Sequence, residues 1–180
     1  LAEFERSWGG RSDLWVFGYA SLIWRPEFDA SEHRPARVAG WHRALRMRSR
    51  VNRGTPQVPG LVFALLPGGS CRGMAYRVED ELRRLWDREM PTGVYDPRLL
   101  PTQTPAGPVR ALTFTLSRRS PACLPALDDA SLLNILRHAS GRFVTTLEYL
   151  IETATALKAC DIHDREIERL VQIARRGGLA

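Results

Sequence analysis

The spacing of apolar residues predicts strands along the N-terminal part of the chain and helices towards its C-terminus. An aromatic and β-branched run indicates a buried strand at 14–19, and further strands are predicted at 38–51, 61–66, 71–78 and 109–117. Pro67 to Ser70 separates two of these strands, which are therefore expected to form a hairpin. Helices are predicted at 79–90, 129–139, 143–158 and 163–176. The proline-containing stretches 25–37, 52–60 and 91–108 are predicted to be loops.

This order of elements indicates an α+β protein. Strands come first, one helix precedes the last strand, and the remaining helices follow. A doubly wound sheet would alternate strands and helices regularly, which this chain does not do. The length of 180 residues suits one domain. Residues 1–13 are polar and lack periodicity, so we expect a flexible N-terminal lead-in followed by a single domain over 14–180.

The charge balance suggests a polyanionic partner at first sight. The formal net charge is +6 and the isoelectric point is about 9.9, as in many nucleic-acid-binding proteins. However, 20 acidic residues are interspersed among the basic ones, and the densest arginine group lacks aromatic residues on its own face. No nucleic-acid partner is therefore expected. That group is predicted to be a solvated strand face or, as the second interpretation, an anion-binding face; it comprises Arg43, Arg46, Arg48, Arg50 and Arg53.

Cysteine and histidine usage gives no sign of a metal site. Cys71, Cys123 and Cys160 are odd in number and far apart, and the four histidines lack ligand spacing. No apolar run approaches the ~18 residues that span a bilayer, so no membrane partner is expected. Because the thiols are expected to be reduced and residues 1–13 contain no secretory pattern, we expect a cytoplasmic protein.

Glu89 occupies an unusual position for a charged residue. The predicted helix 79–90 has an apolar stripe formed by Leu82, Leu85, Trp86 and Met90. Glu89 lies four residues after Leu85 and three after Trp86, which places its carboxylate on the same face. Burial would raise its pKa, as suits a general acid or base. On spacing alone, the more frequent case is that such a glutamate turns to solvent or pairs with an arginine.

The second candidate is the run of small residues after the first strand, Gly18-Tyr19-Ala20-Ser21-Leu22. Small residues at a strand end allow backbone N–H groups to face a ligand, an arrangement that binds carboxylates and oxyanions. The same run would also form a tight turn without any ligand. Ser21 does not lie in a G-x-S-x-G motif, so serine-hydrolase chemistry has no support.

Several segments together resemble one family. Val16-Phe17-Gly18-Tyr19-Ala20-Ser21-Leu22-Ile23-Trp24 is similar to V-F-G-Y-G-S-L-I-W, the signature of the ChaC family of γ-glutamylcyclotransferases. Further similar segments follow in the family's order: Arg53-Gly54-Thr55-Pro56 with Pro59-Gly60, Gly69 to Arg77, Leu85 to Met90 with Tyr95, and Glu148-Tyr149-Leu150. The resemblance extends from about Leu14 into the last helix.

The resemblance implies a small mixed β-barrel with surrounding helices, and cleavage of a γ-glutamyl amide by its own α-amine. In the ChaC branch the small-molecule substrate is glutathione, and the products are 5-oxoproline and Cys-Gly. The reaction requires no cofactor. The family's catalytic glutamate falls on Glu89. Its substrate loop falls on Val16, Phe17, Gly18, Tyr19, Ala20, Ser21 and Leu22.

One position departs from the signature, because Ala20 replaces a glycine. If the backbone there has a positive φ, alanine costs about 1 kcal/mol and shifts the loop. If φ is negative, the added methyl group only narrows the binding site. The alternatives to a glutathione-specific enzyme are a cyclotransferase for other γ-glutamyl amines or amino acids, and a non-catalytic γ-glutamyl-binding homologue altered at Ala20.

Overall fold

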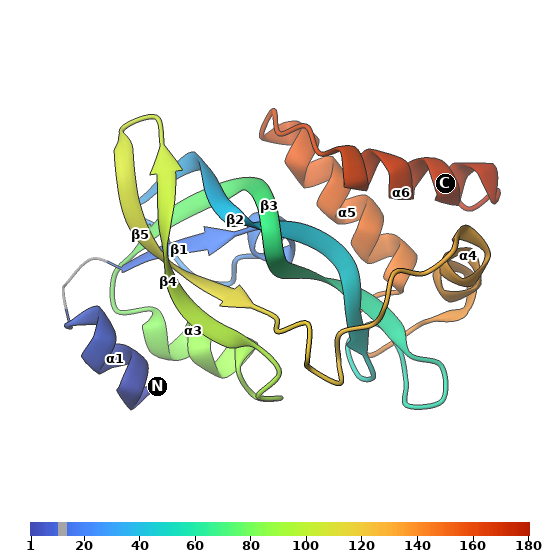
Figure 1. The fold of residues 1–180 in the computed structure, drawn as a ribbon, viewed down its shortest axis with the longest axis horizontal. Coiled ribbons are helices and arrows are strands. Elements are labelled where there is room, and N and C mark those ends of the chain that lie inside the picture. The colour runs from blue at the N-terminus through green and yellow to red at the C-terminus, as the bar shows by residue number, and fades with distance from the viewer. Residues whose placement is uncertain (11–13) are drawn as a thin grey trace. The chain divides into compact units, whose positions relative to one another are not determined.

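A closed barrel is the central element of the computed structural model, which describes residues 1–10 and 14–180 (Figure 1). Its strands are β1 (Leu14–Gly18), β2 (Glu32–Ser49), β3 (Gly60–Val78), β4 (Asp96–Thr104) and β5 (Gly107–Thr115). They follow one another around the barrel as β1-β3-β2-β4-β5, and β3 also pairs with β5. This barrel, followed by C-terminal helices, confirms the predicted α+β class.

The chain divides into two compact units, which are described separately. Unit 1 comprises Leu1–His42 and Leu65–Ser117, and unit 2 comprises Arg43–Ala64 and Arg118–Ala180. The strands β2 and β3 are long enough to contribute residues to both units. Both candidate segments from the sequence, Val16 to Leu22 and Glu89, belong to unit 1. A single domain over 14–180 stays a prediction.

Strand β1 forms the core of unit 1. It pairs antiparallel with β3, from Leu14 opposite Val78 to Gly18 opposite Met74, and it pairs parallel with β5. The side chains of Val16 and Phe17 are fully buried, as their position in an aromatic and β-branched run predicts. Full burial of one such side chain stabilises the fold by about 1.5–3 kcal/mol.

Three strands begin inside stretches that the sequence predicted as loops, 25–37 and 91–108, and one of them is β5, which starts at Gly107. Strand β2 already begins at Glu32, and β4 occupies Asp96–Thr104. Pro97 and Pro101 suggested an irregular segment. Because they lie four residues apart, both missing N–H donors fall on the same edge of β4. The residues between them remain available for the antiparallel ladder that joins β4 to β5 along its whole length. Long-range pairing therefore overrides the local proline signal.

The predicted hairpin over 61–78 is wrong. The chain continues as the single strand β3 through Pro67 to Ser70. Gly68 and Gly69 have φ angles of 105° and 70°, which only glycine adopts readily. The two glycines therefore allow a local distortion within one continuous barrel strand. In the sequence, the same residues look like a hairpin turn, because both structures favour glycine.

The helices of unit 1 are short. α2 (Ser21–Trp24) was not predicted, and α3 (Leu82–Glu89) lies within the predicted helix 79–90. The lead-in predicted over 1–13 contains the helix α1 (Ala2–Trp8), in which Phe4 is buried with its ring centroid 5.6 Å from that of Trp86. Residues 11–13 of that lead-in lie outside the described residues, and its flexibility stays a prediction.

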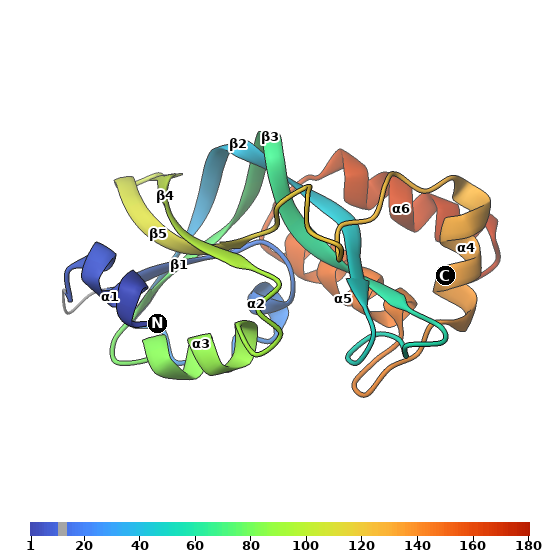
Figure 2. The ribbon, with the colours of Figure 1, turned by 60° about the horizontal axis from the view of Figure 1, so that its bottom comes forward.

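Unit 2 contains the helices α4 (Asp129–His138), α5 (Thr146–Ala159) and α6 (Arg165–Arg176), each within a few residues of its predicted range (Figure 2). Local signals explain this agreement. Thr145 and Glu148 form a reciprocal capping box at the start of α5, and the Asp164 carboxylate accepts hydrogen bonds from the first amides of α6. Leu150 and Leu157 are fully buried on the inner face of α5.

The densest arginine group is not a solvated strand face throughout. The Arg43 side chain has no exposed surface and forms an ion pair with Asp164. Arg53 is also buried, with its guanidinium carbon 4.9 Å from the centre of the Tyr149 ring. The prediction is wrong for these two residues because their partners come from segments distant in the sequence.

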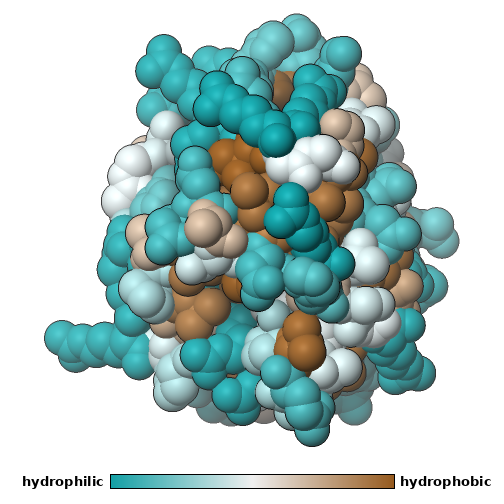
Figure 3. Space-filling view, turned by 90° about the vertical axis from the view of Figure 1, so that its right-hand side faces the viewer, coloured by the Kyte–Doolittle hydropathy of each residue, from teal (hydrophilic) through white to brown (hydrophobic). Residues whose placement is uncertain are grey.

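Among the described residues, no helix has the length and apolar character required to cross a bilayer. The face shown in Figure 3 is mostly hydrophilic, with apolar side chains in groups between the polar ones. Val51, Val58 and Phe143 are exposed large apolar side chains of unit 2.

Candidate active site

Helix α3 holds Glu89 at its last position. One turn earlier, Leu85 is buried, so helical spacing directs the glutamate towards the same apolar face. The Glu89 side chain is only 15% exposed, and its Oε1 lies 3.0 Å from Arg88 Nε. The two interpretations left open by the sequence therefore both apply, since the carboxylate is mostly buried and is also paired with an arginine.

Burial raises the pKa of Glu89 above the ordinary glutamate value, and this is the largest influence on it. The neighbouring Arg88 guanidinium opposes that rise in pKa through its charge and its hydrogen bond. The negative charge of Glu27 raises the pKa further. A carboxyl group with a raised pKa is suited to accept and return protons near neutral pH.

The segment Val16 to Leu22 has two structurally different parts. Val16 and Phe17 belong to β1, where their side chains are buried and their backbones pair with Tyr76 and Ala75 of β3. Gly18 ends the strand, and a Cβ atom there would lie only 3.0 Å from the Tyr76 ring. Val16 and Phe17 therefore position the segment, and the backbone after Gly18 is the part that leaves the sheet.

The residues after Gly18 turn directly into helix α2. The buried Tyr19 hydroxyl donates a hydrogen bond of 2.9 Å to the carbonyl oxygen of Phe114, which anchors the turn to β5. Ala20 is the N-cap of α2, and its carbonyl accepts a hydrogen bond from the N–H of Ile23. The first amides of a helix precede its own hydrogen-bond ladder, so those of Ser21 and Leu22 have no acceptor within α2.

The backbone at Ala20 decides between the two consequences of losing the signature glycine. Its φ angle is −148°, so the penalty of alanine in the left-handed region does not arise. The residue is buried, with 6% of its surface exposed. The replacement therefore adds one buried methyl group next to the turn.

We expect Ala20→Gly to keep the turnover of the protein within about threefold, because the native φ is negative. Glycine should lower the stability by about 0.5–1 kcal/mol through the greater freedom of the unfolded chain. Turnover of γ-glutamyl donors and urea denaturation of both proteins measure these effects. A wild type without activity and an active Ala20→Gly would instead identify Ala20 as the cause of a lost function.

The sequence reasoning did not single out Arg88. Its guanidinium contacts both the Glu89 carboxylate and the residues around α2, so it joins the two candidate segments within unit 1. The available signal was its position directly before Glu89. An arginine next to a glutamate is too common in helices to indicate such a role by itself.

Other segments of the resemblance have an architectural role. A Cβ atom at Gly73 would lie 2.3 Å from the carbonyl oxygen of Gly18, so glycine permits the close approach of β3 to the end of β1. In unit 2, a Cβ atom at Gly54 would lie 2.0 Å from the Gly60 nitrogen. These glycines are required for packing between backbones.

The sequence is similar to known proteins over most of its length. Residues 14–176 match the model of a family described as ChaC-like protein. A glutathione-specific gamma-glutamylcyclotransferase of Escherichia coli is 34% identical over 164 residues, which cover 88% of this chain and 71% of the relative. The glutathione-specific gamma-glutamylcyclotransferase 1 of Homo sapiens is 36% identical over 172 residues, with 88% and 76% of the two chains covered.

The fold is also similar to that of solved structures. A crystal structure of a gamma-glutamyl cyclotransferase specific to glutathione from yeast superposes with a TM-score of 0.82. The match covers 93% of this chain and 97% of the yeast chain at 19% sequence identity. This similarity confirms the small barrel with surrounding helices as a fold of the γ-glutamylcyclotransferase type.

Proposed function

The chain belongs to the ChaC-like protein family, and from this premise we propose that it is a γ-glutamylcyclotransferase that degrades glutathione to 5-oxoproline and Cys-Gly. The observation that supports the activity most directly is the mostly buried Glu89 carboxylate in the unit that also contains the loop Val16 to Leu22. The substrate is proposed because curated relatives from bacteria and vertebrates are named as glutathione-specific.

In the proposed reaction, Glu89 acts first as a base and then as an acid. It takes a proton from the α-ammonium group of the γ-glutamyl residue. The freed amine attacks the γ-carbonyl carbon, the new C–N bond closes the lactam ring, and the original amide C–N bond breaks. Glu89 returns this proton to the leaving nitrogen as the amide bond breaks. The attacking nitrogen loses a second proton when the lactam forms, and this proton passes to the released amine, so no proton is gained or lost overall. General acid–base catalysis of this kind accelerates reactions by about 10²–10⁴-fold.

The backbone amides of Tyr19 to Leu22 are proposed to bind the α-carboxylate of the substrate or the oxyanion that develops on the γ-carbonyl. Removing one well-placed donor to an oxyanion costs about 3–4 kcal/mol in known enzymes. Holding the γ-glutamyl arm in a folded conformation would also reduce the entropic cost of ring closure. In this scheme Val16 and Phe17 act through their position in β1.

Incubation with glutathione tests the proposed function directly. We expect stoichiometric formation of 5-oxoproline and Cys-Gly, measured by chromatography, without any added cofactor. Several γ-glutamyl dipeptides serve as competing donors, and glutathione should have the highest kcat/KM. Comparable or higher kcat/KM with other donors would favour a broader cyclotransferase. Saturable binding of every donor without 5-oxoproline would show a non-catalytic binding protein.

A cytoplasmic location and a lack of nucleic-acid binding complete the proposal. Cys71, Cys123 and Cys160 are free thiols, which suits a reducing compartment. The positive net charge calls for a separate test, because a nucleic-acid-binding protein would show an affinity that falls steeply with salt. We expect no specific nucleic-acid binding.

A further inference from the structure

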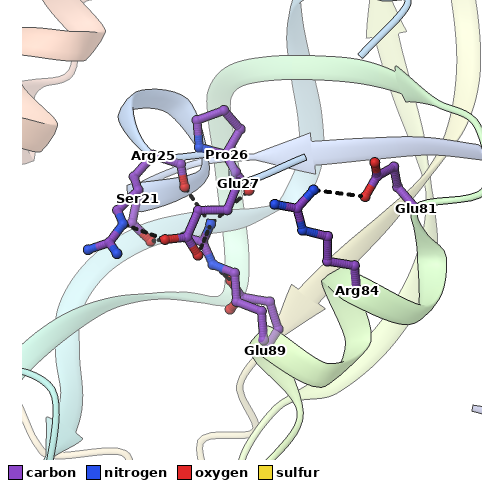
Figure 4. A network of polar contacts seen from close by, with 8 residues as sticks. Ser21, Arg25, Pro26, Glu27, Glu81, Arg84 and Glu89 are labelled. Carbon is purple, nitrogen blue, oxygen red and sulfur yellow. Dashed lines mark hydrogen bonds and ion pairs between the residues drawn. The ribbon is translucent and has the colours of Figure 1, made fainter. Parts of the chain in front are cut away.

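One side chain connects Glu89 to Ser21 of the proposed substrate loop and to the residues that follow α2. Arg88 Nε lies 3.0 Å from the Glu89 carboxylate. Its Nη1 donates to the carbonyl oxygens of Arg25 and Pro26, at 2.7 Å in the case of Pro26. Its Nη2 lies 3.5 Å from the hydroxyl oxygen of Ser21, the first residue of α2. Figure 4 shows how Ser21, Arg25 and Pro26 approach the same region as Glu89.

Glu27 adds a second carboxylate to this group. Its Oε2 lies 3.3 Å from Arg88 Nη1, and its Oε1 accepts a hydrogen bond of 2.5 Å from Arg25 Nε. The φ angle of Glu27 is 57°, in the left-handed region that residues other than glycine rarely adopt. The contacts with the two arginines hold this unfavourable backbone in place, so the turn after α2 has a defined position relative to α3.

We propose that Arg88 is a positioning residue for the reaction, whose guanidinium fixes the Glu89 carboxylate relative to the turn that contains Ser21. This inference depends on the proposed role of Glu89. A guanidinium has five donors in one rigid plane, so it holds a carboxylate and two backbone carbonyls in a fixed arrangement. An ammonium group retains the charge but has no such rigid fork.

Arg88 also favours the charged form of Glu89. The charged groups facing that carboxylate are Arg88 itself and Glu27, the latter being paired with Arg25. Burial and the charge of Glu27 raise the pKa of Glu89, and replacing Arg88 would remove the influence that opposes them. A base with a higher pKa becomes ionised only at higher pH, so the acid limb of the kcat/KM profile must move to higher pH.

The variants Arg88→Gln and Arg88→Lys separate the charge from the geometry. For Arg88→Gln we expect the acid limb of kcat/KM for glutathione to move up by about one pH unit, and kcat to fall about 100-fold. For Arg88→Lys we expect the limb to stay in place while kcat falls. The control is Arg84→Gln, because Arg84 lies on the same helix, is 63% exposed and pairs with Glu81. Arg84→Gln should match wild type in kcat and in the pH at which the acid limb of kcat/KM lies.

A direct titration makes the result independent of turnover. The Glu89 carboxyl carbon can be followed by NMR in ¹³C-labelled protein, with Glu89→Gln used to assign its signal. An upward shift of its titration in Arg88→Gln supports the influence of Arg88 on the Glu89 carboxylate even if wild type converts no γ-glutamyl donor. That second result would refute the proposed function and, with it, a role of Arg88 in the reaction. An unmoved titration in folded Arg88→Gln, or a wild-type kcat in both Arg88 variants, would overturn the proposal. If Arg88→Gln does not fold, Arg88→Lys decides through its kcat.

Discussion

Glu89→Gln should lower kcat for 5-oxoproline release by about 10²–10⁴-fold while the protein remains folded. The amide has nearly the same shape as the carboxylate, but it cannot take a proton from the substrate ammonium. Because the side chain is mostly buried next to Arg88, bulk water cannot easily substitute for it. Chromatographic measurement of 5-oxoproline at saturating glutathione gives the comparison.

The matched control for this experiment is Glu81→Gln. Glu81 is the N-cap of the same helix, and its side chain is 18% exposed, close to the value for Glu89. Its removal eliminates one ion pair with Arg84 and leaves the proposed site unaltered. Full activity of Glu89→Gln, or an equal loss in Glu81→Gln, would refute the assignment of Glu89 as the acid–base group.

The substitution Glu89→Gln should lower activity but raise stability at some pH values. Since burial raises the pKa of Glu89, the folded protein binds this proton more tightly than the unfolded chain does. Wild type therefore loses stability as the pH rises from the ordinary glutamate pKa of 4.5 through the raised value, and the cost is constant above it. Urea denaturation over a pH series should show Glu89→Gln gaining stability relative to wild type over this interval. A constant difference at every pH would contradict the raised pKa.

Gly73→Ala should destabilise the protein by about 3 kcal/mol, because both atoms that the new methyl group meets are rigidly held. The added Cβ would lie 2.3 Å from the carbonyl oxygen of Gly18 and 2.9 Å from the ring of Phe17. Gly18 is paired with Met74 in the barrel, and the Phe17 ring is fully buried. Relief of these contacts requires the end of β1 to move away from β3.

That movement should also reduce catalysis. The turn that starts at Gly18 contains the amides proposed to bind substrate, and a displacement of about 1 Å is enough to cost about 100-fold in rate. Thermal denaturation and kcat/KM for glutathione measure the two effects. The control is Ser70→Ala on the same strand, where the side chain is exposed. A Gly73→Ala protein with wild-type stability would show that β1 and β3 can separate at this position without a loss of stability.

Local signals in the sequence were sufficient for several elements and for the position of Glu89. Glu89 lies four residues after Leu85 and three after Trp86, and helical geometry alone then places it on the apolar face of α3. The predicted ranges of α5 and α6 were also close, and the structure shows caps at both helix starts that lie within a few residues of the amides they bind. The signature over Val16 to Trp24 indicated the family, which the match over residues 14–176 confirmed.

Other features required the tertiary structure. Strand β4 contains Pro97 and Pro101 and exists because β5 supplies its hydrogen-bond partners. The Pro67 to Ser70 segment became part of the continuous strand β3, which has β1, β2 and β5 as its neighbours in the barrel. In each case the local preference was a turn or a loop, and pairing with a distant segment outweighed it.

The candidate site likewise has features that the sequence determined and features that only the tertiary structure decided. By itself the sequence determined which residues are chemically able to act, a glutamate on an apolar helix face and a small-residue turn after a buried strand. Only the tertiary structure decided that φ at Ala20 is negative, and that Arg88 joins Glu89 to Ser21 and Pro26. The reason is physical: the spacing of side chains within one helix follows from its regular geometry, whereas contacts between residues more than 60 positions apart depend on how the whole barrel closes.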